Sequence, residues 1–300
     1  MPQGPAGDGA GHGLHGPLRR RQPGDAVSAA VSRLVQAYGP WAVVTGASDG
    51  IGRAFAHHLA AEGLHLVLVA RREPALAALA GGLQQAYGVQ CRVLPADLSD
   101  LEAVHRLAEA TADLDVGLLV AAAGFGTSGL FLDGDLGVET AMVDLNCTAV
   151  AALAWHFGPR LVQRGRGGVV FLSSLVAFHG TAHAANYAAT KAYVQTLAEG
   201  LRAEWAGQGV DVIASAPGPI RSGFAERAGM QMAQAMPAEV VARVTMQALG
   251  RQTTVRPGWL SKLLGWSLAV LPRWAQVRVM SQVMKGMTAH RAQARQAAST

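Results

Sequence analysis

The sequence predicts an α/β fold in which a doubly wound parallel sheet of about seven strands carries helices on both faces. Three observations support this prediction. Short apolar runs alternate with longer segments of helical pattern between residues 41 and 216. The run at residues 66–70 is apolar throughout, which is typical of a parallel strand buried on both faces. A glycine-rich turn follows the first run and precedes a helical segment.

The expected elements follow one another in strand–helix order. An amphipathic helix at residues 26–38 leads into the first strand. The expected strands are residues 41–46, 66–70, 90–95, 116–122, 168–173 and 210–216. The expected helices between them are residues 53–63, 74–87, 101–114, 136–163 and 184–206. Right-handed crossovers bring the carboxyl ends of the strands to one edge, where such sheets bind ligands. The residues at these ends include Ser48, Arg71, Asp97, Gly124, Ser174 and Pro217.

The glycine turn connects the first strand to the following helix. Gly46 permits a tight turn, Gly50 lets backbone amides approach a pyrophosphate, and Gly52 allows close packing of the helix. The positive end of the helix would face the phosphates. Because a strand precedes this turn and a helix follows it, the segment predicts a dinucleotide-binding site.

A second set of residues predicts proton transfer. Tyr187 and Lys191 stand four residues apart and therefore share one face of a helix. An ammonium beside a phenol lowers the pKa of the phenol, which can then pass a proton near neutral pH. The hydroxyl of Ser174, at the preceding strand end, would hold the other side of the same substrate oxygen.

Composition bounds the class and the compartment. Half of the 300 residues are apolar and 15% are charged, which suits one large domain with a buried sheet. The two cysteines, Cys91 and Cys147, are too few for a disulfide framework and favour a reducing interior. No secretory signal is recognisable. We therefore expect a cytoplasmic protein, with membrane association left open.

The chain divides into three predicted regions. Residues 1–25 are rich in Gly, Pro and His, and we expect them to be disordered. Residues 26–256 contain the dinucleotide-binding pattern and form the predicted catalytic domain. Residues 257–300 are an amphipathic, basic extension expected to be helical. Nine Lys and Arg residues, but no acidic residue, follow Glu239.

The C-terminal extension has two interpretations. Three tryptophans, basic residues and no acid fit an interfacial helix on an anionic membrane. Its longest uncharged run, residues 263–272, is too short to span a bilayer. The other interpretation, which we favour, is a lid over the substrate pocket or a contact between subunits.

Taken together, the motifs resemble the short-chain dehydrogenase/reductase family in its single-domain branch. The segment TGASDGIG matches the family pattern T-G-x-x-x-G-x-G, and Ser174, Tyr187 and Lys191 match its S and Y-x-x-x-K set. The likeness covers residues 41–255, with every motif in family order. The further matches are Asn146 at the family's catalytic asparagine, Asp97 and Leu98 at its adenine contact, and Pro217, Gly218 and Ile220 at its nicotinamide segment.

The resemblance implies direct hydride transfer between cofactor and substrate carbon, with no metal. Tyr187 is then the general acid in reduction and the base in oxidation, while Lys191 lowers its pKa and holds a nicotinamide ribose hydroxyl. Ser174, rather than its neighbour Ser173, donates to the carbonyl oxygen as negative charge develops there. Asn146 is expected to hold a water that connects Lys191 to solvent, or else to be a structural helix residue. The expected cofactor-binding residues are Gly46, Ser48, Asp49, Gly50, Ile51, Gly52, Arg71, Arg72, Asp97, Leu98, Ala122, Gly124, Tyr187, Lys191, Pro217, Gly218 and Ile220.

The residues after the second strand favour NADP(H) over NAD(H). An acidic side chain there would bind the ribose diol of NAD, whereas Arg71 and Arg72 can pair with a 2′-phosphate. Asp49, in the glycine turn, is a mild counterweight. Where the family usually has N-N-A-G, this chain has Ala121-Ala122-Ala123-Gly124. We expect that departure to cost some stability or cofactor order without loss of chemistry.

The sequence predicts a carbonyl reductase or alcohol dehydrogenase with a lipophilic substrate, either steroid-like or 3-oxoacyl. The alternative is an NADP-binding regulatory protein that keeps the fold without turnover. A homodimer or homotetramer is expected by resemblance, through the helices at residues 136–163 and 184–206. No organised base-reading motif is found, so nucleic acid is not an expected partner.

Overall fold

The computed structural model describes residues 32–230 and 235–298, which belong to one compact unit. The predicted disordered extension at residues 1–25 and the start of the predicted helix at residues 26–38 lie outside the described residues. The rest of that helix is α1 (Arg33–Tyr38). Its N-terminus is capped by Ser32, whose hydroxyl accepts hydrogen bonds from the amides of Leu34 and Val35.

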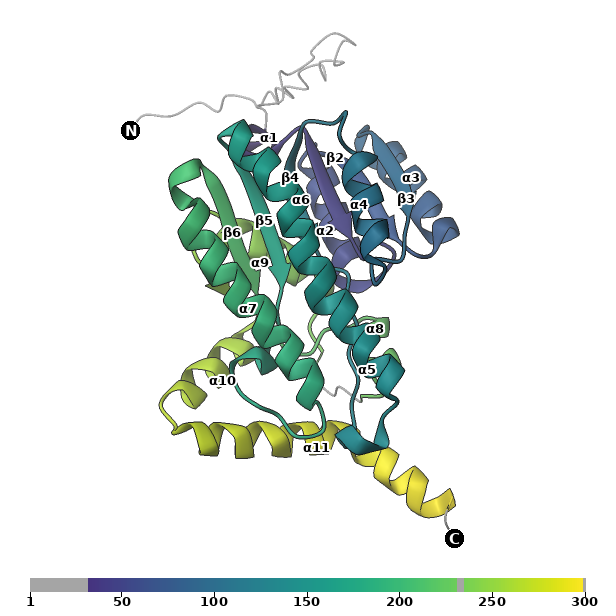
Figure 1. Ribbon diagram of the computed structural model, residues 1–300, viewed down its shortest axis with the longest axis vertical. Coiled ribbons are helices and arrows are strands. Elements are labelled where there is room, and N and C mark those ends of the chain that lie inside the picture. The colour runs from purple at the N-terminus through teal and green to yellow at the C-terminus, as the bar shows by residue number, and fades with distance from the viewer. Residues whose placement is uncertain (1–31, 231–234, 299–300) are drawn as a thin grey trace, which may run out of the picture. The chain divides into compact units, whose positions relative to one another are not determined.

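Seven strands of the described residues form one parallel sheet, in the order β3-β2-β1-β4-β5-β6-β7 (Figure 1). This confirms the predicted doubly wound sheet. Val44 of β1 lies opposite Leu68 of β2 and Val120 of β4, so the apolar runs meet at the centre. The strands are β1 (Trp41–Thr45), β2 (His65–Ala70), β3 (Cys91–Pro95), β4 (Val116–Ala121), β5 (Gly167–Leu172), β6 (Val210–Ser215) and β7 (Thr254–Val255).

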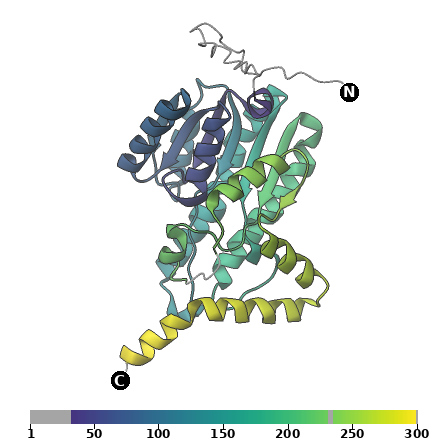
Figure 2. The same cartoon turned by 180° about the vertical axis from the view of Figure 1, so that it is seen from behind.

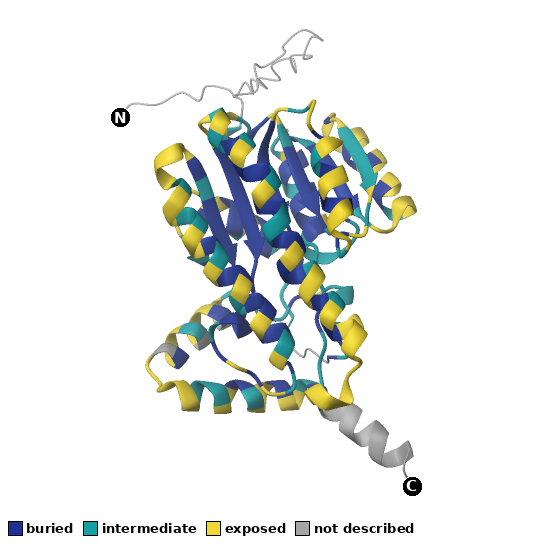
Figure 3. Cartoon of the chain, viewed as in Figure 1, coloured by how far each residue is buried: buried dark blue, intermediate teal, exposed yellow. Residues whose placement is uncertain are grey.

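Helices cover both faces of this sheet (Figure 1, Figure 2). One face packs against α2 (Gly50–Ala61), α3 (Glu73–Tyr87) and α9 (Ala238–Ala248). The other packs against α4 (Leu101–Glu109), α6 (Ala149–Arg164) and α7 (Ala185–Trp205). Phe55 and Phe157, fully buried, represent the two layers of core. Figure 3 shows the strands as buried and the outer helix faces as exposed, as expected of a sheet between two layers of helices.

The predicted helix at residues 136–163 is continuous but irregular. It begins as α5 (Leu136–Val143), passes through a π-helical segment (Asp144–Thr148) and continues as α6. The whole helix, Leu136–Arg164, is long and apolar enough to cross a bilayer by length and composition. In this fold, however, α6 buries Leu153 and Phe157 against the sheet, which is the position of a core helix.

Residues 217–256, for which no element was predicted, contain the one-turn helix α8 (Gly223–Arg227), α9 and the two-residue strand β7. Elements as short as α8 and β7 carry too few residues to show a hydrophobic period. Three short 3₁₀ segments also occur within the described residues: Phe131–Asp133, Leu175–Phe178 and Ala206–Gln208.

The predicted helical extension is confirmed as α10 (Trp259–Ala269) and α11 (Arg273–Ala298). Both helices lie beyond the carboxyl-terminal edge of the sheet (Figure 1). There they complete a third apolar cluster, in which Leu268, Met280 and Met284 pack with Tyr187 and Met230. The extension is therefore part of the folded unit and packs on the region where ligands are expected.

We expect Tyr38→Phe to destabilise the protein by about 2 kcal/mol, because it removes a hydrogen bond to a carboxylate. The Tyr38 hydroxyl donates to Oδ2 of Asp211 at 2.7 Å and thereby ties α1 to β6. Urea unfolding measures the loss. Tyr87→Phe is the control: its side chain is 43% exposed, so its stability should change by less than about 0.5 kcal/mol. Equal stability of the two variants would contradict the role of this bond.

Candidate functional site

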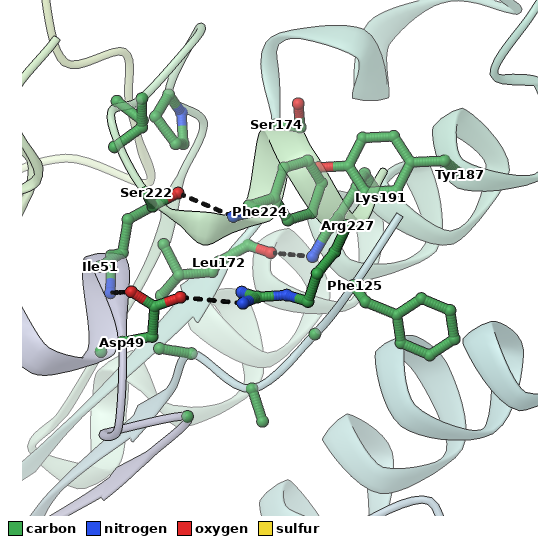
Figure 4. Close-up of a pocket in the computed structure, with 18 of the residues that line it drawn as sticks. Asp49, Ile51, Phe125, Leu172, Ser174, Tyr187, Lys191, Ser222, Phe224 and Arg227 are labelled. Carbon is green, nitrogen blue, oxygen red and sulfur yellow. Dashed lines mark hydrogen bonds and ion pairs between the residues drawn. The ribbon is translucent and has the colours of Figure 1, made fainter. Parts of the chain in front are cut away.

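One cavity of about 680 Å³ lies at the carboxyl ends of the central strands. It contains all seventeen residues predicted to bind the cofactor, together with Ser174. Figure 4 shows Ser174, Tyr187 and Lys191 gathered on one side of this cavity, with Asp49 and Arg227 on another. Asn146, the remaining predicted catalytic residue, is fully buried outside the cavity lining. The fold therefore brings together the motifs that the sequence separates by more than 100 residues.

The glycine turn has the geometry that a bound pyrophosphate requires. Gly46 has φ of 67°, a left-handed conformation that favours glycine. A Cβ on Gly52 would lie 2.3 Å from the carbonyl oxygen of Gly46, so the first turn of α2 can pack this closely only without a side chain. The N-terminus of α2 thus faces the cavity, where helix-end amides attract anions, although the Asp49 carboxylate already accepts a hydrogen bond from the Gly50 amide at 2.7 Å.

Arg71 and Arg72 lie on the cavity wall beyond β2 and contact different neighbours. The Arg72 guanidinium donates to the Ser48 carbonyl oxygen at 3.4 Å and to its hydroxyl at 3.3 Å. Arg71 forms an ion pair with Asp97, with 3.7 Å between nitrogen and oxygen. Burial opposes ionisation of Asp97, but hydrogen bonds from Ser99 and the charge of Arg71 lower its pKa overall. This end of the cavity is polar and largely basic.

The segment Ala121-Ala122-Ala123, which departs from the family pattern, is held by a side chain of β1, while the expected loss of stability or cofactor order stays a prediction. The hydroxyl of Thr45 accepts hydrogen bonds from the amides of Ala122 and Ala123, each at 3.0 Å, and donates to the Val120 carbonyl at 3.4 Å. A side chain of β1 therefore holds the end of β4.

The side-chain amide of Asn146 bridges three elements. Its Oδ1 accepts from the Phe125 amide at 3.2 Å, and its Nδ2 donates to the Phe125 carbonyl at 2.9 Å and to Oγ1 of Thr190 at 3.1 Å. These contacts join the loop after β4 to the π-helical segment and to α7. The π turn shifts the helix register locally, and it is this segment that carries Asn146. The structure thus places Asn146 as a structural bridge, while the predicted water relay stays a prediction.

The two neighbouring serines have different partners. Ser173 is buried, and its hydroxyl donates to the Lys191 carbonyl at 3.2 Å. Ser174 caps the 3₁₀ segment Leu175–Phe178, lines the cavity and lies close enough to Tyr187 to lower the pKa of its hydroxyl. Both serines line the cavity, but Ser174 is the one whose side chain acts on Tyr187, and its catalytic role stays a prediction.

The titration of the Tyr187–Lys191 pair differs from the sequence expectation. Burial raises the pKa of Tyr187 to about 12, although the Ser174 side chain acts in the opposite direction. Burial lowers the pKa of Lys191 to about 8. The Lys191 ammonium donates to the Leu172 carbonyl at 2.9 Å and lies 5.8 Å from the centre of the Tyr187 ring. Desolvation therefore outweighs the expected depression by Lys191, and Tyr187 holds its proton at neutral pH.

Several cavity residues were not predicted from the sequence. Arg227 of α8 pairs with Asp49, with 3.0 Å between NH1 and Oδ2, and so ties the segment after β6 to the glycine turn. A further group of unpredicted wall residues is apolar and comes from the loop after β4, the 3₁₀ segment after β5, α8 and the residues after it, and α11. No motif marks these residues, although helical spacing of the methionines signalled an apolar face on α11. They are Phe125, Val176, Phe224, Met230, Met280, Val283, Met284 and Met287.

Comparison with known families decides the classification. The model of the short chain dehydrogenase family matches residues 40–233, which is more than half of the chain. The chain belongs to this family. The resemblance drawn from the motifs is thereby confirmed, and so are the predicted Rossmann-type fold and the NAD(P)-dependent dehydrogenase or reductase activity on CH–OH and C=O groups.

Curated relatives come from bacteria and eukaryotes. The chain is 35% identical to a 7beta-hydroxysteroid dehydrogenase of Clostridium sardiniense over 75% of this chain and 88% of that protein. It is 28% identical to a very-long-chain 3-oxoacyl-CoA reductase of Anas platyrhynchos over 88% of this chain and 86% of that protein. The likeness thus extends into the C-terminal half.

Solved structures show the same fold. A structure from work on 7beta-hydroxysteroid dehydrogenase stereoselectivity has a TM-score of 0.77 at 27% identity, covering 82% of this chain and 98% of that chain. A short-chain dehydrogenase from Sphingobium yanoikuyae in complex with NADPH has a TM-score of 0.71 at 30% identity, covering 78% and 97%. One from Burkholderia phymatum in complex with NAD has a TM-score of 0.68 at 25% identity, covering 73% and 88%.

The cavity suits a nicotinamide dinucleotide. At one end lie the glycine turn and the N-terminus of α2, with the Arg71 and Arg72 side chains beside them. At the other end lie Tyr187 and Lys191, which can reach a ribose and a substrate oxygen. No group of three or more His, Cys, Asp or Glu residues is placed to hold a metal ion within the described part of the chain.

We expect the buried Lys191 ammonium to make stability depend on pH. Its pKa is about 8 when folded and near 10.5 when unfolded, so the unfolded state binds more protons between these values. The free energy of unfolding should therefore rise with pH from 8 to 10.5, relative to Lys191→Met, by roughly 1 kcal/mol per pH unit. Urea unfolding of both proteins without cofactor, at a series of pH values, tests this. A difference that is constant with pH would contradict it.

Proposed function

We propose that the protein is an NADP(H)-dependent oxidoreductase that interconverts a carbonyl and a secondary alcohol on a lipophilic substrate, either steroid-like or 3-oxoacyl. One observation carries this proposal. The Ser174–Tyr187 pair stands in a single cavity between a basic wall at Arg71 and Arg72 and an apolar wall that includes residues of α11. The basic side suits a phosphorylated cofactor, and the apolar side suits a hydrophobic substrate.

The residues of the pair have complementary roles. In reduction, the Tyr187 hydroxyl donates its proton to the substrate oxygen, because its raised pKa keeps it protonated at neutral pH. Ser174 donates a hydrogen bond to the same oxygen as negative charge develops there. The Lys191 ammonium holds the nicotinamide ribose and stabilises the phenolate left after proton transfer. The bound cofactor supplies or accepts the hydride.

The preference for NADP(H) rests on the residues beyond β2. Arg72 lies beside Ser48 of the glycine turn, and both line the cavity, where a 2′-phosphate could pair with the guanidinium. Asp49 no longer argues against a phosphate, because Arg227 neutralises its carboxylate. Asp97 is held by Arg71 and Ser99. The related structure with NADPH supports this preference, while the one with NAD shows that the family accepts both cofactors.

The substrate class rests on the wall of the cavity and on the relatives. Methionines from two separate segments, Met230 and the α11 residues Met280, Met284 and Met287, form flexible apolar surface that adapts to irregular ligands. The aligned relatives are named for a hydroxysteroid and for a very-long-chain 3-oxoacyl thioester. Both contain a secondary alcohol or ketone on a large apolar frame. A homodimer or homotetramer and a cytoplasmic location remain predictions from the sequence.

We expect Tyr187→Phe to lower kcat by at least about 100-fold, because it removes the proton donor while keeping the ring. NADPH affinity should change little. Turnover is followed by NADPH oxidation with a panel of hydroxysteroid-derived ketones and 3-oxoacyl thioesters, and binding by NADPH fluorescence. Tyr193→Phe, at an exposed position on the same helix, is the matched control. Full activity of Tyr187→Phe would refute the role of Tyr187, and wild-type binding of NADPH without any turnover would favour the regulatory alternative.

We expect Arg72→Ala to weaken NADPH binding by roughly 10- to 100-fold, since a charged hydrogen-bonding partner of the 2′-phosphate is lost. The affinity for NADH should change by less than about threefold, because NADH lacks that phosphate. Titration of both cofactors measures the ratio. Arg106→Ala, which removes an exposed arginine from α4, should leave both affinities unchanged. An equal loss for NADPH and NADH would argue against a phosphate contact.

A further inference from the structure

The helix α10 has an apolar stripe that faces away from the protein. Trp259, Leu263, Trp266 and Val270 follow one another at intervals of four, three and four residues, which places them on one side of a helix. Their exposed fractions are 72%, 51%, 75% and 76%. A soluble protein rarely exposes so many large apolar side chains in one row, so this stripe calls for a partner.

The opposite side of α10 is already packed. Ser261 and Leu268 are 4% and 3% exposed, and Leu268 belongs to the third apolar cluster with Met280 and Met284. A Cβ on Gly218 would lie 2.6 Å from the hydroxyl oxygen of Ser261, so the helix sits tightly on the segment after β6. Because the other face of α10 already packs on the protein, the outward stripe is not the face that attaches this helix to the core.

The next helix adds a third tryptophan and positive charge. Trp274 of α11 is 69% exposed, and Arg278 and Lys285 follow it at four and eleven residues, on the same side of the helix and also exposed. Met280 and Met284 are buried on a different side of the helix, which lines the cavity. We give the name C-terminal platform to eight exposed side chains at α10 and α11: Trp259, Lys262, Leu263, Trp266, Val270, Trp274, Arg278 and Lys285.

The charged side chains of the platform, Lys262, Arg278 and Lys285, are all basic. No acidic residue follows Glu239 in the sequence. A cleft of about 740 Å³ between α9, β7 and α10 opens beside Trp266, and its lining includes Arg251, Arg256 and Lys262 but no carboxylate. Exposed tryptophans bordered by cations match the bilayer interface, where indole rings sit at headgroup level and ammonium groups pair with phosphates.

We propose that the C-terminal platform binds the surface of an anionic phospholipid bilayer. The contact is interfacial and not spanning, because α10 has eleven residues and is about 16 Å long, half the thickness of the hydrocarbon core. Tryptophan and leucine side chains enter the boundary between headgroups and acyl chains, while Lys262, Arg278 and Lys285 hold anionic headgroups. An acidic lipid surface fits this charge pattern better than a second copy of the chain, which would place like charges opposite each other.

The platform and the cavity share the helix α11, and the role that we infer from this sharing rests on the proposed function. The inward residues Met280 and Met284 of α11 line the cavity, and the outward residues of the same helix belong to the platform. Docking would therefore bring the apolar wall of the site next to lipid. A lipophilic ketone could then reach Tyr187 from the bilayer without crossing water.

Vesicle co-sedimentation of the full-length protein, without substrate or cofactor, tests the docking independently of turnover. The wild type should pellet with vesicles of phosphatidylglycerol and phosphatidylcholine, and much less with phosphatidylcholine alone or in high salt. The double variant Trp259→Ser/Trp266→Ser should bind the anionic vesicles at least about tenfold more weakly. Trp155→Ser is the matched control, since Trp155 on α6 is 78% exposed outside the platform, and it should bind like the wild type.

A charge variant tests the same proposal independently, in case the tryptophan variant fails to fold. Lys285→Glu should lower binding about fivefold or more, while Arg33→Glu on α1 should not. Circular dichroism and turnover of a water-soluble ketone should stay unchanged in all of these variants.

Absence of wild-type binding, or equal binding of platform and control variants, would overturn the proposal. A third contrary outcome combines two measurements: the wild type does not bind vesicles, and Trp259→Ser/Trp266→Ser loses a dimer that the wild type forms in sedimentation velocity. The platform would then be a contact between subunits. If the wild-type protein binds vesicles but turns over no ketone, the proposed function is refuted and the docking proposal stands.

Discussion

The buried side-chain amide of Asn146 is the contact on which the site depends. It bonds to both backbone groups of Phe125 and to the hydroxyl of Thr190, and so holds the loop after β4 against α7. Lys191 follows Thr190 directly, and Tyr187 lies one turn earlier, with its carbonyl accepting from the same Thr190 hydroxyl. A shift of this contact would move the floor of the cavity and the proton-transferring pair together. Loss of these hydrogen bonds would leave a buried amide unpaired and destabilise the folded state, which favours the observed arrangement.

The cavity changes character along its length, and burial explains its chemistry. Arg71, Arg72 and the N-terminal end of α2 make one side favourable for phosphates. On the other side, desolvation raises the pKa of Tyr187 and lowers that of Lys191, so a protonated phenol stands beside a readily neutralised amine. The helix α11 completes this apolar side with Met280, Met284 and Met287. The same extension presents tryptophans and cations outward.

Local patterns predicted the parts of the protein that local physics governs. The strand at residues 66–70, the glycine turn and the Tyr187–Lys191 spacing each follow from the period of an element or the conformational freedom of glycine. The π turn at Asn146 and the one-turn helix α8 were not predicted, because they leave no period in the sequence. The Thr45 hydroxyl that braces Ala122 and Ala123 was missed for another reason, since the partners lie 77 and 78 residues apart. The sign of the Tyr187 pKa shift was wrong at the sequence level because burial cannot be read from spacing.

What the sequence by itself determined is the class of the protein: the order of strands and helices, the dinucleotide turn, and the family with its hydride-transfer chemistry. These follow from short-range patterns that have few alternative readings when they occur together. Only the tertiary structure decided which side chains meet. It paired Arg227 with Asp49, joined the Phe125 backbone to Thr190 through the Asn146 amide, and turned the methionines of α11 inward and its tryptophan outward. Such choices depend on packing between distant segments, where one face of a helix is buried and the other is left to solvent or lipid.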